Sequence, residues 1–435
     1  MSIQSRFLIG AANSGSGKTT LTIGLLKALA NRGFNIQPFK CGPDYIDTKF
    51  HEAAASNPSV NLDLFLSSTE HVRYLYNKYA SGKDICIIEG VMGLYDGYKK
   101  MQGSSAEIAE LLDIPVILVV NAKSMAYSAA ALIYGFKEFY PGINVAGVIF
   151  NFVGSESHYS FLEDACKDAG VEPLGYLPKD REIETPSRHL GLSLDGQSHF
   201  DNLANKIAGL IEKTVDIDRL LKITSQEINL HSHRQTEQVI QNLNITVAQD
   251  AAFNFVYHEN IEYLKRLGNV SFFSPLKDKI LPATDLLYLP GGYPELYVDE
   301  LSNNKPMKEC IRAYIENGGK ALAECGGMMY LSDSITDTEG KIYPMTGILG
   351  QKATMQNMKL KLGYRQFRYN NVDIKGHEFH YSSIEKDDKD LQVDIEIQNA
   401  KGQPTGTKLF RYKNLIAGYT HVYWSEMDNL LDLFK

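Results

Sequence analysis

The feature that most constrains the fold is a glycine-rich run, Ala12-Asn-Ser-Gly-Ser-Gly-Lys-Thr-Thr20. An apolar run at residues 7–11 precedes it, and an amphipathic stretch at residues 19–32 follows it directly. A strand, a tight glycine turn and a helix in this order form the P-loop arrangement, in which backbone N–H groups and the helix N-terminus surround a phosphate. Ala12 stands where the motif usually begins with glycine, but the flanking elements are where the mechanism needs them. The run predicts a nucleotide site at the edge of a parallel sheet.

The rest of the first half continues this alternation of strand and helix. Apolar runs typical of buried strands occur at residues 85–89, 115–121 and 145–151, and helical periodicity occurs at residues 106–113 and 128–139. An α/β fold with a mostly parallel sheet is therefore predicted.

A polar segment separates the two halves. Residues 224–242 show little apolar periodicity and follow one further amphipathic helix, expected at residues 202–221, so they are interpreted as a linker. The expected division is a first domain at residues 1–223 and a second α/β domain at residues 243–435. In the second domain, strands are expected at residues 245–249, 285–289 and 320–324, helices at residues 260–267 and 307–317, and shorter β-like segments beyond residue 348.

Length, charge and cysteine content limit the class of protein. A chain of 435 residues has room for two large domains. The net charge of −8 argues against a nucleic-acid binder, and five cysteines without a CxxC pair favour a reducing compartment over a disulfide framework or a zinc site. The apolar stretch at residues 7–12 is too short for a signal peptide or a membrane span. We expect a soluble cytoplasmic protein without a membrane or nucleic-acid partner.

Charged residues near the predicted P-loop are candidates for phosphoryl chemistry, which needs carboxylates and magnesium beside the terminal phosphates. Glu89 ends the strand at residues 85–89 and would lie beside the P-loop if that strand is adjacent. Lys40 could neutralise a transferring phosphoryl group or a substrate carboxylate, Asp44 could complete the metal site, and Thr19 would bind magnesium through its hydroxyl. The predicted nucleotide-binding residues are Ser14, Gly15, Ser16, Gly17, Lys18, Thr19, Thr20 and Lys40, and the predicted metal ligands are Thr19, Asp44 and Glu89.

The second half contains a cysteine at a sharp turn. Glu324-Cys-Gly-Gly327 lies between an expected strand and an expected helix, which is the layout of a nucleophile elbow. The small residues after Cys325 would free backbone N–H groups for an oxyanion hole. A buried structural cysteine is the alternative. The glycine pair Gly291-Gly292 follows another strand and would either donate an oxyanion N–H or only turn the chain.

A thiol nucleophile needs a histidine to accept its proton. Three histidines lie downstream, His377, His380 and His421. His421 lies in a short β-like run followed by a loop, where a base could be exposed. His377 and His380 have i, i+3 spacing, but without further ligands nearby they are expected to line a pocket or pack a loop rather than bind metal.

Six runs, in order along nearly the whole chain, closely resemble the cobyrinate a,c-diamide synthases, glutamine-dependent amidotransferases of corrinoid biosynthesis. The runs lie at residues 39–47, 89–97, 250–255, 290–296, 324–327 and 376–382, and include Gly42-Pro-Asp-Tyr-Ile-Asp47, Pro290-Gly-Gly-Tyr-Pro-Glu295 and Gly376-His-Glu-Phe-His-Tyr381. The resemblance implies a dethiobiotin-synthetase-like ATP domain fused to a class I glutamine amidotransferase domain. It also implies that ATP and magnesium phosphorylate two carboxylates of a tetrapyrrole in turn, and that ammonia from glutamine attacks each acyl phosphate.

The resemblance also implies roles for individual residues. Cys325 would be the nucleophile and His421 its base, while phosphate or metal contacts would come from Lys18, Thr19, Asp44 and Glu89. Tyr423 stands where the family often has a second histidine, so no residue is assigned to orient His421. Ser187, in the run Pro186–Gly191, stands where the family usually has a glutamate that contacts substrate. The expected partners are glutamine, a tetrapyrrole carboxylic acid and a second copy of the chain.

Three alternatives remain open at the level of sequence. The same chemistry could act on hydrogenobyrinate or on a nickel sirohydrochlorin, since nothing in the sequence selects the ring or its metal. The chain could be a synthetase that uses free ammonia. It could also be a P-loop ATPase of the partition or regulatory kind with a degenerate second half, although a degenerate domain would not be expected to keep Cys325, the double glycine and His421 together.

Overall fold

A computed structural model describes residues 2–183, 197–228, 241–386 and 389–435 and divides the chain into two compact units, residues 1–234 and 235–435. The run at residues 186–191, with Ser187, and residues 229–240 of the expected linker lie outside the described residues. Within the described ranges, no helix combines the length and the apolar character that a membrane crossing requires.

The first unit is built on an eight-stranded sheet with the order β3-β2-β4-β1-β5-β6-β7 and β8 beside β1. All neighbouring strands are parallel except β8, which is antiparallel to β1. This confirms the predicted mostly parallel α/β fold. The strands are β1 (Ser2–Ala11), β2 (Ile36–Cys41), β3 (Val60–Leu62), β4 (Ile85–Glu89), β5 (Val116–Asn121), β6 (Val145–Val153), β7 (Glu172–Pro178) and β8 (Ser225–Ile228).

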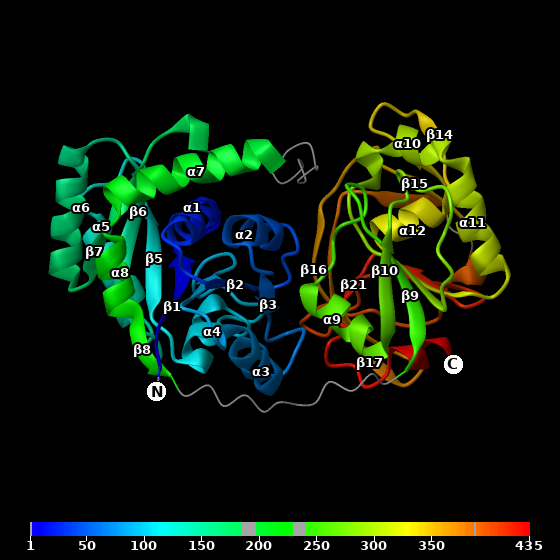
Figure 1. Ribbon diagram of the computed structural model, residues 1–435, viewed down its shortest axis with the longest axis horizontal. Coiled ribbons are helices and arrows are strands. Elements are labelled where there is room, and N and C mark those ends of the chain that lie inside the picture. Colours follow the sequence, from blue (N-terminus) through cyan, green and yellow to red (C-terminus); the bar gives the residue numbers. More distant parts are fainter. Residues whose placement is uncertain (1, 184–196, 229–240, 387–388) are drawn as a thin grey trace. The chain divides into compact units, whose positions relative to one another are not determined.

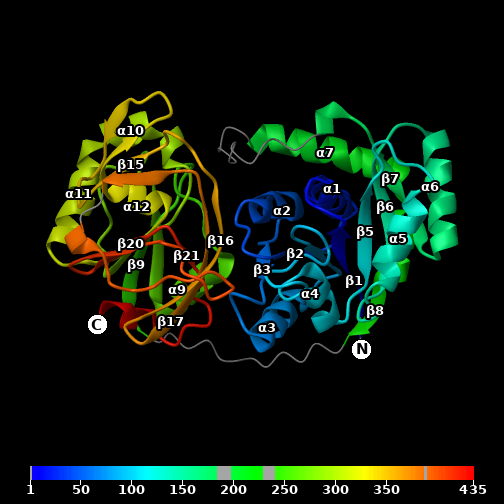
Figure 2. The same cartoon turned by 180° about the vertical axis from the view of Figure 1, so that it is seen from behind.

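Helices cover both faces of this sheet. In Figures 1 and 2, α1, α2 and α7 lie along one face, whereas α3 and α4 lie along the other. The backbones of α1 and α7 approach closely at Gly24, where a Cβ would meet Ile207 Cγ2 at 2.3 Å. The helices are α1 (Lys18–Asn31), α2 (Asp47–Ala55), α3 (Thr69–Ala80), α4 (Ser105–Leu112), α5 (Ala129–Glu138), α6 (Glu156–Ala169), α7 (Gln197–Thr214) and α8 (Ile217–Thr224), with a short 3-10 helix at Arg181–Ile183.

Two sequence predictions are wrong near the end of this unit. The single helix expected at residues 202–221 is two helices, because the chain breaks at Val215 and Asp216 accepts the Arg219 N–H at 2.9 Å to cap α8. Residues 225–228 of the expected linker form β8, which pairs with the start of β1. This strand is short and polar, so it carries no apolar alternation that the sequence could reveal.

The second unit is built on a six-stranded sheet with the order β10-β9-β11-β12-β20-β19, parallel except for β19. Its strands are β9 (Leu243–Ala248), β10 (Gly268–Phe273), β11 (Leu286–Leu289), β12 (Lys320–Glu324), β19 (Leu409–Tyr412) and β20 (Leu415–Gly418). Its helices are α9 (His258–Leu267), α10 (Val298–Asn303), α11 (Lys305–Glu316) and α12 (Gly326–Leu331), with 3-10 helices at Pro294–Leu296, Lys389–Leu391 and Leu430–Phe434.

Two smaller sheets complete the second unit and account for the β-like character beyond residue 348. The first, β14-β13-β15-β18, shares a core with α10, α11 and α12, and the second, β16-β17-β21, shares a core with α9 and Trp424. Their strands are β13 (Ser332–Thr336), β14 (Ile342–Pro344), β15 (Leu349–Thr354), β18 (Ser383–Lys386), β16 (Lys361–Tyr369), β17 (Val372–His380) and β21 (His421–Val422).

Candidate active sites

The glycine-rich run forms a turn between β1 and α1, as its sequence predicts. Gly15 and Gly17 have φ angles of 77° and 94°, a left-handed conformation that glycine adopts without strain. A Cβ at Gly17 would lie 1.8 Å from Asn151 Nδ2, so this position has no space for a side chain. Asn151, at the end of β6, donates from Nδ2 to the carbonyl of Ser16 at 3.0 Å and fixes the loop from outside.

The side chains of the loop divide into those that shape it and those that face outward. The hydroxyl of Ser16 donates to Asn13 Oδ1 at 2.7 Å, which is a contact within the loop. Ser14 is exposed. Lys18 Nζ donates to the carbonyls of Met92 at 2.6 Å and Asn13 at 3.3 Å, so its ammonium lies at the loop. This position suits a lysine that exchanges carbonyl contacts for phosphate oxygens.

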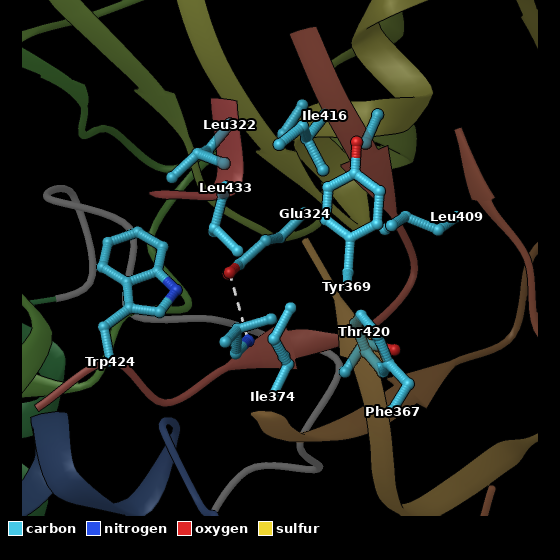
Figure 3. A pocket seen from close by; sticks show the side chains of 14 residues that line it. Leu322, Glu324, Phe367, Tyr369, Ile374, Leu409, Ile416, Thr420, Trp424 and Leu433 are labelled. Carbon is cyan, nitrogen blue, oxygen red and sulfur yellow. Dashed lines mark hydrogen bonds between the residues drawn. The ribbon is translucent and has the colours of Figure 1, made fainter. Parts of the chain in front are cut away.

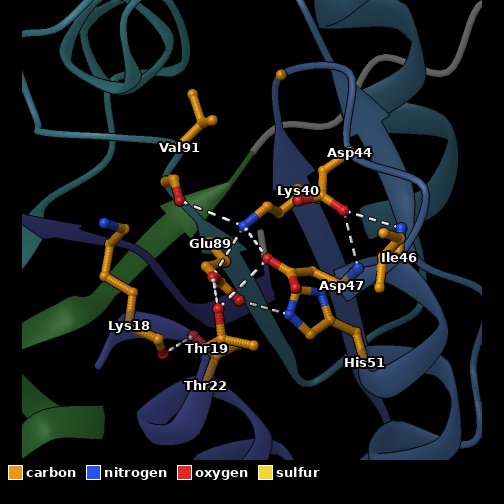
Figure 4. A network of polar contacts seen from close by, with 12 residues as sticks. Lys18, Thr19, Thr22, Lys40, Asp44, Ile46, Asp47, His51, Glu89 and Val91 are labelled. Carbon is orange, nitrogen blue, oxygen red and sulfur yellow. Dashed lines mark hydrogen bonds and ion pairs between the residues drawn. The ribbon is translucent and has the colours of Figure 1, made fainter. Parts of the chain in front are cut away.

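A buried ionic cluster lies beside the loop (Figure 4). Lys40 Nζ donates to Asp47 Oδ2 and to Glu89 Oε1, both at 2.8 Å, and Thr19 donates to Glu89 Oε1 at 2.7 Å. Register explains the pairing, because Lys40 on β2 is the partner of Glu89 on β4, and β4 also pairs with β1. The predicted adjacency of Glu89 and the P-loop strand is therefore present.

The charges of this cluster hold one another ionised. Burial alone would lower the pKa of Lys40, but the carboxylates of Asp47 and Glu89 outweigh it and raise that pKa above its ordinary value. Burial would likewise raise the pKa of Glu89, but Lys40 and a 2.6 Å hydrogen bond with His51 Nε2 hold it low. The cluster thus presents a net negative, oxygen-rich surface to the P-loop.

Asp44 and Asp47 have different positions, which the sequence alone did not separate. Asp44 Oδ1 accepts the backbone N–H groups of Ile46 at 2.8 Å and Asp47 at 2.9 Å, at the start of α2. Asp47 Oδ2, by contrast, lies 3.3 Å from the hydroxyl of Thr19. Asp47 is therefore better placed than Asp44 to join Thr19 and Glu89, and the metal role of Asp44 stays a prediction.

The oxygens at this point fit a magnesium ion. Thr19 Oγ1, Glu89 Oε1 and Asp47 Oδ2 converge, and Mg²⁺ prefers oxygen ligands, usually one or two carboxylates completed by phosphate and water. Among the described residues, no group of three or more acidic, histidine or cysteine side chains could hold a metal ion by itself.

In the second unit, Cys325 lies on a strained turn between β12 and α12. Its φ and ψ are 45° and −104°, a conformation that costs a non-glycine residue on the order of 1–3 kcal/mol. Glycines allow the elbow and the loop after β11 to approach closely, since a Cβ at Gly326 would lie 3.0 Å from the N atom of Gly292. Burial raises the pKa of the Cys325 thiol, and the negative charge of the nearby Glu295 raises it further. The turn has the geometry of the predicted elbow.

His421 begins β21, shortly after the end of β20, the strand that pairs with β12. Cys325 N donates to Gly418 O at 2.7 Å, and His421 follows three residues after Gly418. A Cβ at Gly291 would meet His421 Cε1 at 2.1 Å, so the glycine after β11 makes room for this ring. Burial, then the neighbouring His377 and His380, lowers the pKa of His421 to about 3, which keeps the imidazole neutral and able to accept a proton.

His377 and His380 belong to a buried group beside His421. His377 is the cross-strand partner of His421, and the ring of His380 stacks on Tyr419 with centroids 3.6 Å apart. Glu378, which lies between the two histidines in the sequence, forms an ion pair with Arg365 at 2.7 Å. The predicted packing role of these histidines fits these contacts.

Both units of the chain are similar to known proteins. A profile described as the CobQ/CobB/MinD/ParA nucleotide binding domain matches residues 7–192, and one described as a CobB/CobQ-like glutamine amidotransferase domain matches residues 244–429. A cobyrinate a,c-diamide synthase from Caldanaerobacter subterraneus subsp. tengcongensis is 41% identical over 430 residues, which cover 96% of this chain and 94% of the relative. Relatives with the same name from Picrophilus torridus and Fusobacterium nucleatum are each 40% identical, over 98% and 96% of this chain and 97% of each relative.

The chain belongs to the cobyrinate a,c-diamide synthase family. The resemblance found in the sequence is thereby confirmed, and the P-loop unit and the elbow unit correspond to the nucleotide-binding and amidotransferase domains of this family. A weaker likeness, with a TM-score of 0.30 and 17% identity over 40% of this chain and 89% of the other, links it to a solved glutamine amidotransferase.

Several residues that sequence reasoning left out contact the phosphate site of this family member. Asn151 and His51 come from segments far from the P-loop in sequence, so only the strand order reveals them. Asp47 was visible as part of the run at residues 39–47, but its separation from Asp44 depends on where α2 begins. Thr20, which the sequence did predict, is buried in the first turn of α1.

Proposed function

We propose that the chain is a glutamine-dependent ligase that converts the a and c carboxylates of cobyrinate to amides. Two sets of candidate site residues support the proposal, in one chain that is similar to cobyrinate a,c-diamide synthases over nearly its full length. One is a P-loop with a converging hydroxyl and carboxylates, and the other is a strained cysteine beside a neutral histidine. We assign the synthetase role to residues 1–223 and the glutaminase role to residues 243–435.

In the first unit, the P-loop residues bind ATP. The predicted contacts from Ser14 to Thr20 surround the phosphates, and Lys18 leaves the carbonyls of Met92 and Asn13 to neutralise the terminal phosphates. Thr19 and Glu89, with Asp47 beside them, would hold Mg²⁺, which supplies charge neutralisation at the phosphates when bound. Lys40 is placed to stabilise charge at the substrate carboxylate or on the phosphoryl group.

A carboxylate is a poor acyl donor until its oxygen becomes part of a better leaving group. In the proposed step, a carboxylate oxygen of the ring attacks the terminal phosphorus of ATP, and ADP leaves. The acyl phosphate then reacts with ammonia, which forms the amide C–N bond and releases inorganic phosphate.

In the second unit, Cys325 attacks the side-chain carboxamide of glutamine. His421 accepts the thiol proton and returns a proton to the departing ammonia, and water releases glutamate from the thioester. Burial lowers the pKa of His421 and raises the pKa of the Cys325 thiol, so the proposed proton transfer starts from a neutral imidazole and a thiol. Because the reaction consumes ATP and needs a free thiol, we propose the cytoplasm as its location, with a homodimer as the expected assembly.

Product analysis tests this function. Purified protein is incubated with ATP, Mg²⁺, glutamine and cobyrinate, and the ring is weighed by mass spectrometry. The expected result is two successive changes of hydroxyl to amine on one ring, with ATP consumed for each. ATP turnover without a mass change would redirect the same chemistry to hydrogenobyrinate or nickel sirohydrochlorin, and the absence of stimulation by any tetrapyrrole acid would refute the proposal.

A further inference from the structure

A buried carboxyl group lies between the segments that carry the nucleophile and the base. Glu324 is the last residue of β12 and directly precedes Cys325, and its parallel partner on β20 is Gly418. Its side chain is 8% exposed. Glu324 Oε2 accepts the Tyr288 hydroxyl at 2.7 Å, and Oε1 accepts the N–H of Val422, the residue after His421, at 3.1 Å. The carboxyl group is therefore fixed at both oxygens.

The fixed carboxyl faces the catalytic histidine. Glu324 Oε2 lies 4.0 Å from His421 Nδ1, which is within ion-pair distance of a protonated imidazole and longer than a hydrogen bond. Catalytic hydrogen bonds are often long before substrate binds and tighten in the complex. Gly291 lies against the ring edge at His421 Cε1, between the two ring nitrogens, and leaves the space that the imidazole occupies.

The surroundings of Glu324 make its ionisation depend on a neighbouring positive charge. Glu324 lines a small pocket in which aromatic and aliphatic side chains predominate (Figure 3). Burial there raises the pKa of Glu324 to about 8, in spite of the two hydrogen bonds it accepts. A neighbouring imidazolium is the kind of partner that would favour its ionised form.

Other groups near His421 are committed elsewhere. Tyr423, where the family often has histidine, packs edge-on against Tyr257 with ring centroids 5.6 Å apart. Glu378 forms an ion pair with Arg365 at 2.7 Å and accepts the Thr420 hydroxyl at 3.2 Å. The titratable groups around His421 are His377, Glu378 and His380 on β17, Glu324 on β12, Cys325 at the elbow and Glu295 on the 3-10 helix at Pro294–Leu296.

We propose that Glu324 is the positioning residue of the glutaminase site: it orients His421 and balances the charge that His421 gains. This inference rests on the proposed glutaminase function. The S–H bond of Cys325 breaks, its proton binds His421 Nε2, and the sulfur electron pair attacks the carboxamide carbon of glutamine. The Nδ1–H of the resulting imidazolium donates to Glu324 Oε2. The residue that orients the base thus directly precedes the nucleophile in the sequence, instead of following the base at the position of Tyr423.

The test uses the full chain with Glu324→Gln, and with Tyr288→Phe, which removes one hydrogen bond that fixes Glu324. Glu309→Gln, on the exposed side of α11, is the matched control. Three quantities are measured: glutamate release, the ratio of glutamine-driven to ammonia-driven amidation, and the pH dependence of Cys325 alkylation by iodoacetamide. For Glu324→Gln, glutamate release and the ratio should fall about 100-fold with the KM for glutamine within about threefold of the parent. For Tyr288→Phe the fall should be about 3- to 10-fold.

The outcomes separate the inference from the function on which it rests. Alkylation of Cys325 in Glu324→Gln should be slower than in the parent at pH 8, and Glu309→Gln should match the parent throughout. The positioning role would be overturned if Glu324→Gln kept the parent's ratio of glutamine-driven to ammonia-driven amidation. It would also be overturned if a rise in the KM for glutamine accounted for the whole loss of glutamate release. If the parent makes no amide with either nitrogen source, the proposed synthesis fails, and the comparison of glutamate release still decides the role of Glu324.

Discussion

The pKa of Glu324 makes the stability of the second unit depend on pH in an unusual direction. Burial raises this pKa from the ordinary 4.5 to about 8. Between these values, the folded chain keeps a proton that the unfolded chain has released, so folding stability falls as pH rises and the penalty disappears below the unfolded pKa. Each pH unit in this window is worth about 1.4 kcal/mol. Between pH 6 and pH 8, Glu324 should therefore remove about 2 kcal/mol from the free energy of unfolding.

Glu324→Gln removes the titrating group and keeps an acceptor for Val422 N–H. We expect the stability of the variant, relative to the parent, to rise by about 2 kcal/mol from pH 6 to pH 8. Urea unfolding followed by tryptophan fluorescence measures this, because Trp424 is the only tryptophan of the chain and lines the pocket that holds Glu324. All other titrating groups are common to both proteins and cancel in the difference.

The control for this experiment is Glu309→Gln, whose stability should follow the parent at every pH. A difference between Glu324→Gln and the parent that stays constant from pH 6 to pH 8 would refute the reasoning, since it would show that Glu324 is already ionised in the folded chain. A variant that loses stability at high pH instead would show that the ionised carboxylate is paired in the resting protein.

Three further predictions concern the residues of the two sites. Cys325→Ala should abolish glutamine-driven amidation while amide still forms with ammonium salts, and loss with both nitrogen sources would mean that the cysteine is structural or that the units cannot be uncoupled. Lys18→Ala should remove synthesis with either nitrogen source, and retained turnover would contradict the P-loop assignment. Lys40→Met leaves Asp47 and Glu89 buried without their ammonium group and should lower the unfolding free energy of the first unit by about 3–5 kcal/mol in urea denaturation followed by circular dichroism. A loss below about 1 kcal/mol would show that these carboxylates are well hydrated.

Features that depend on a few consecutive residues could be predicted from the sequence. The turn at Gly17, the strand that ends at Glu89 and the elbow at Cys325 each combine a local backbone requirement with a neighbouring apolar run. For the same reason, the parallel sheets followed from the alternation of apolar strands and amphipathic helices.

Features that depend on register or on strand order could not be predicted in the same way. Asp47 rather than Asp44 lies beside Thr19 because α2 begins at Asp47, whereas Asp44 accepts backbone N–H groups in the turn before the helix, three residues earlier in one polar run. Glu324 looked like a strand-end residue, and its contact with His421 depends on the pairing of β12 with β20 across about ninety residues of chain. Long-range pairing of this kind leaves no periodic pattern in a single sequence.

The central claim is that ATP activates a ring carboxylate and that glutamine supplies the amide nitrogen. Cobyrinate labelled with oxygen-18 in its carboxylates, together with glutamine labelled with nitrogen-15 in its side-chain amide, tests both parts in one reaction with ATP and Mg²⁺. The account predicts nitrogen-15 in each new amide and one oxygen-18 in inorganic phosphate for each amide formed. Amide formation with unlabelled phosphate would contradict the acyl phosphate, and unlabelled amide nitrogen would contradict the role of Cys325.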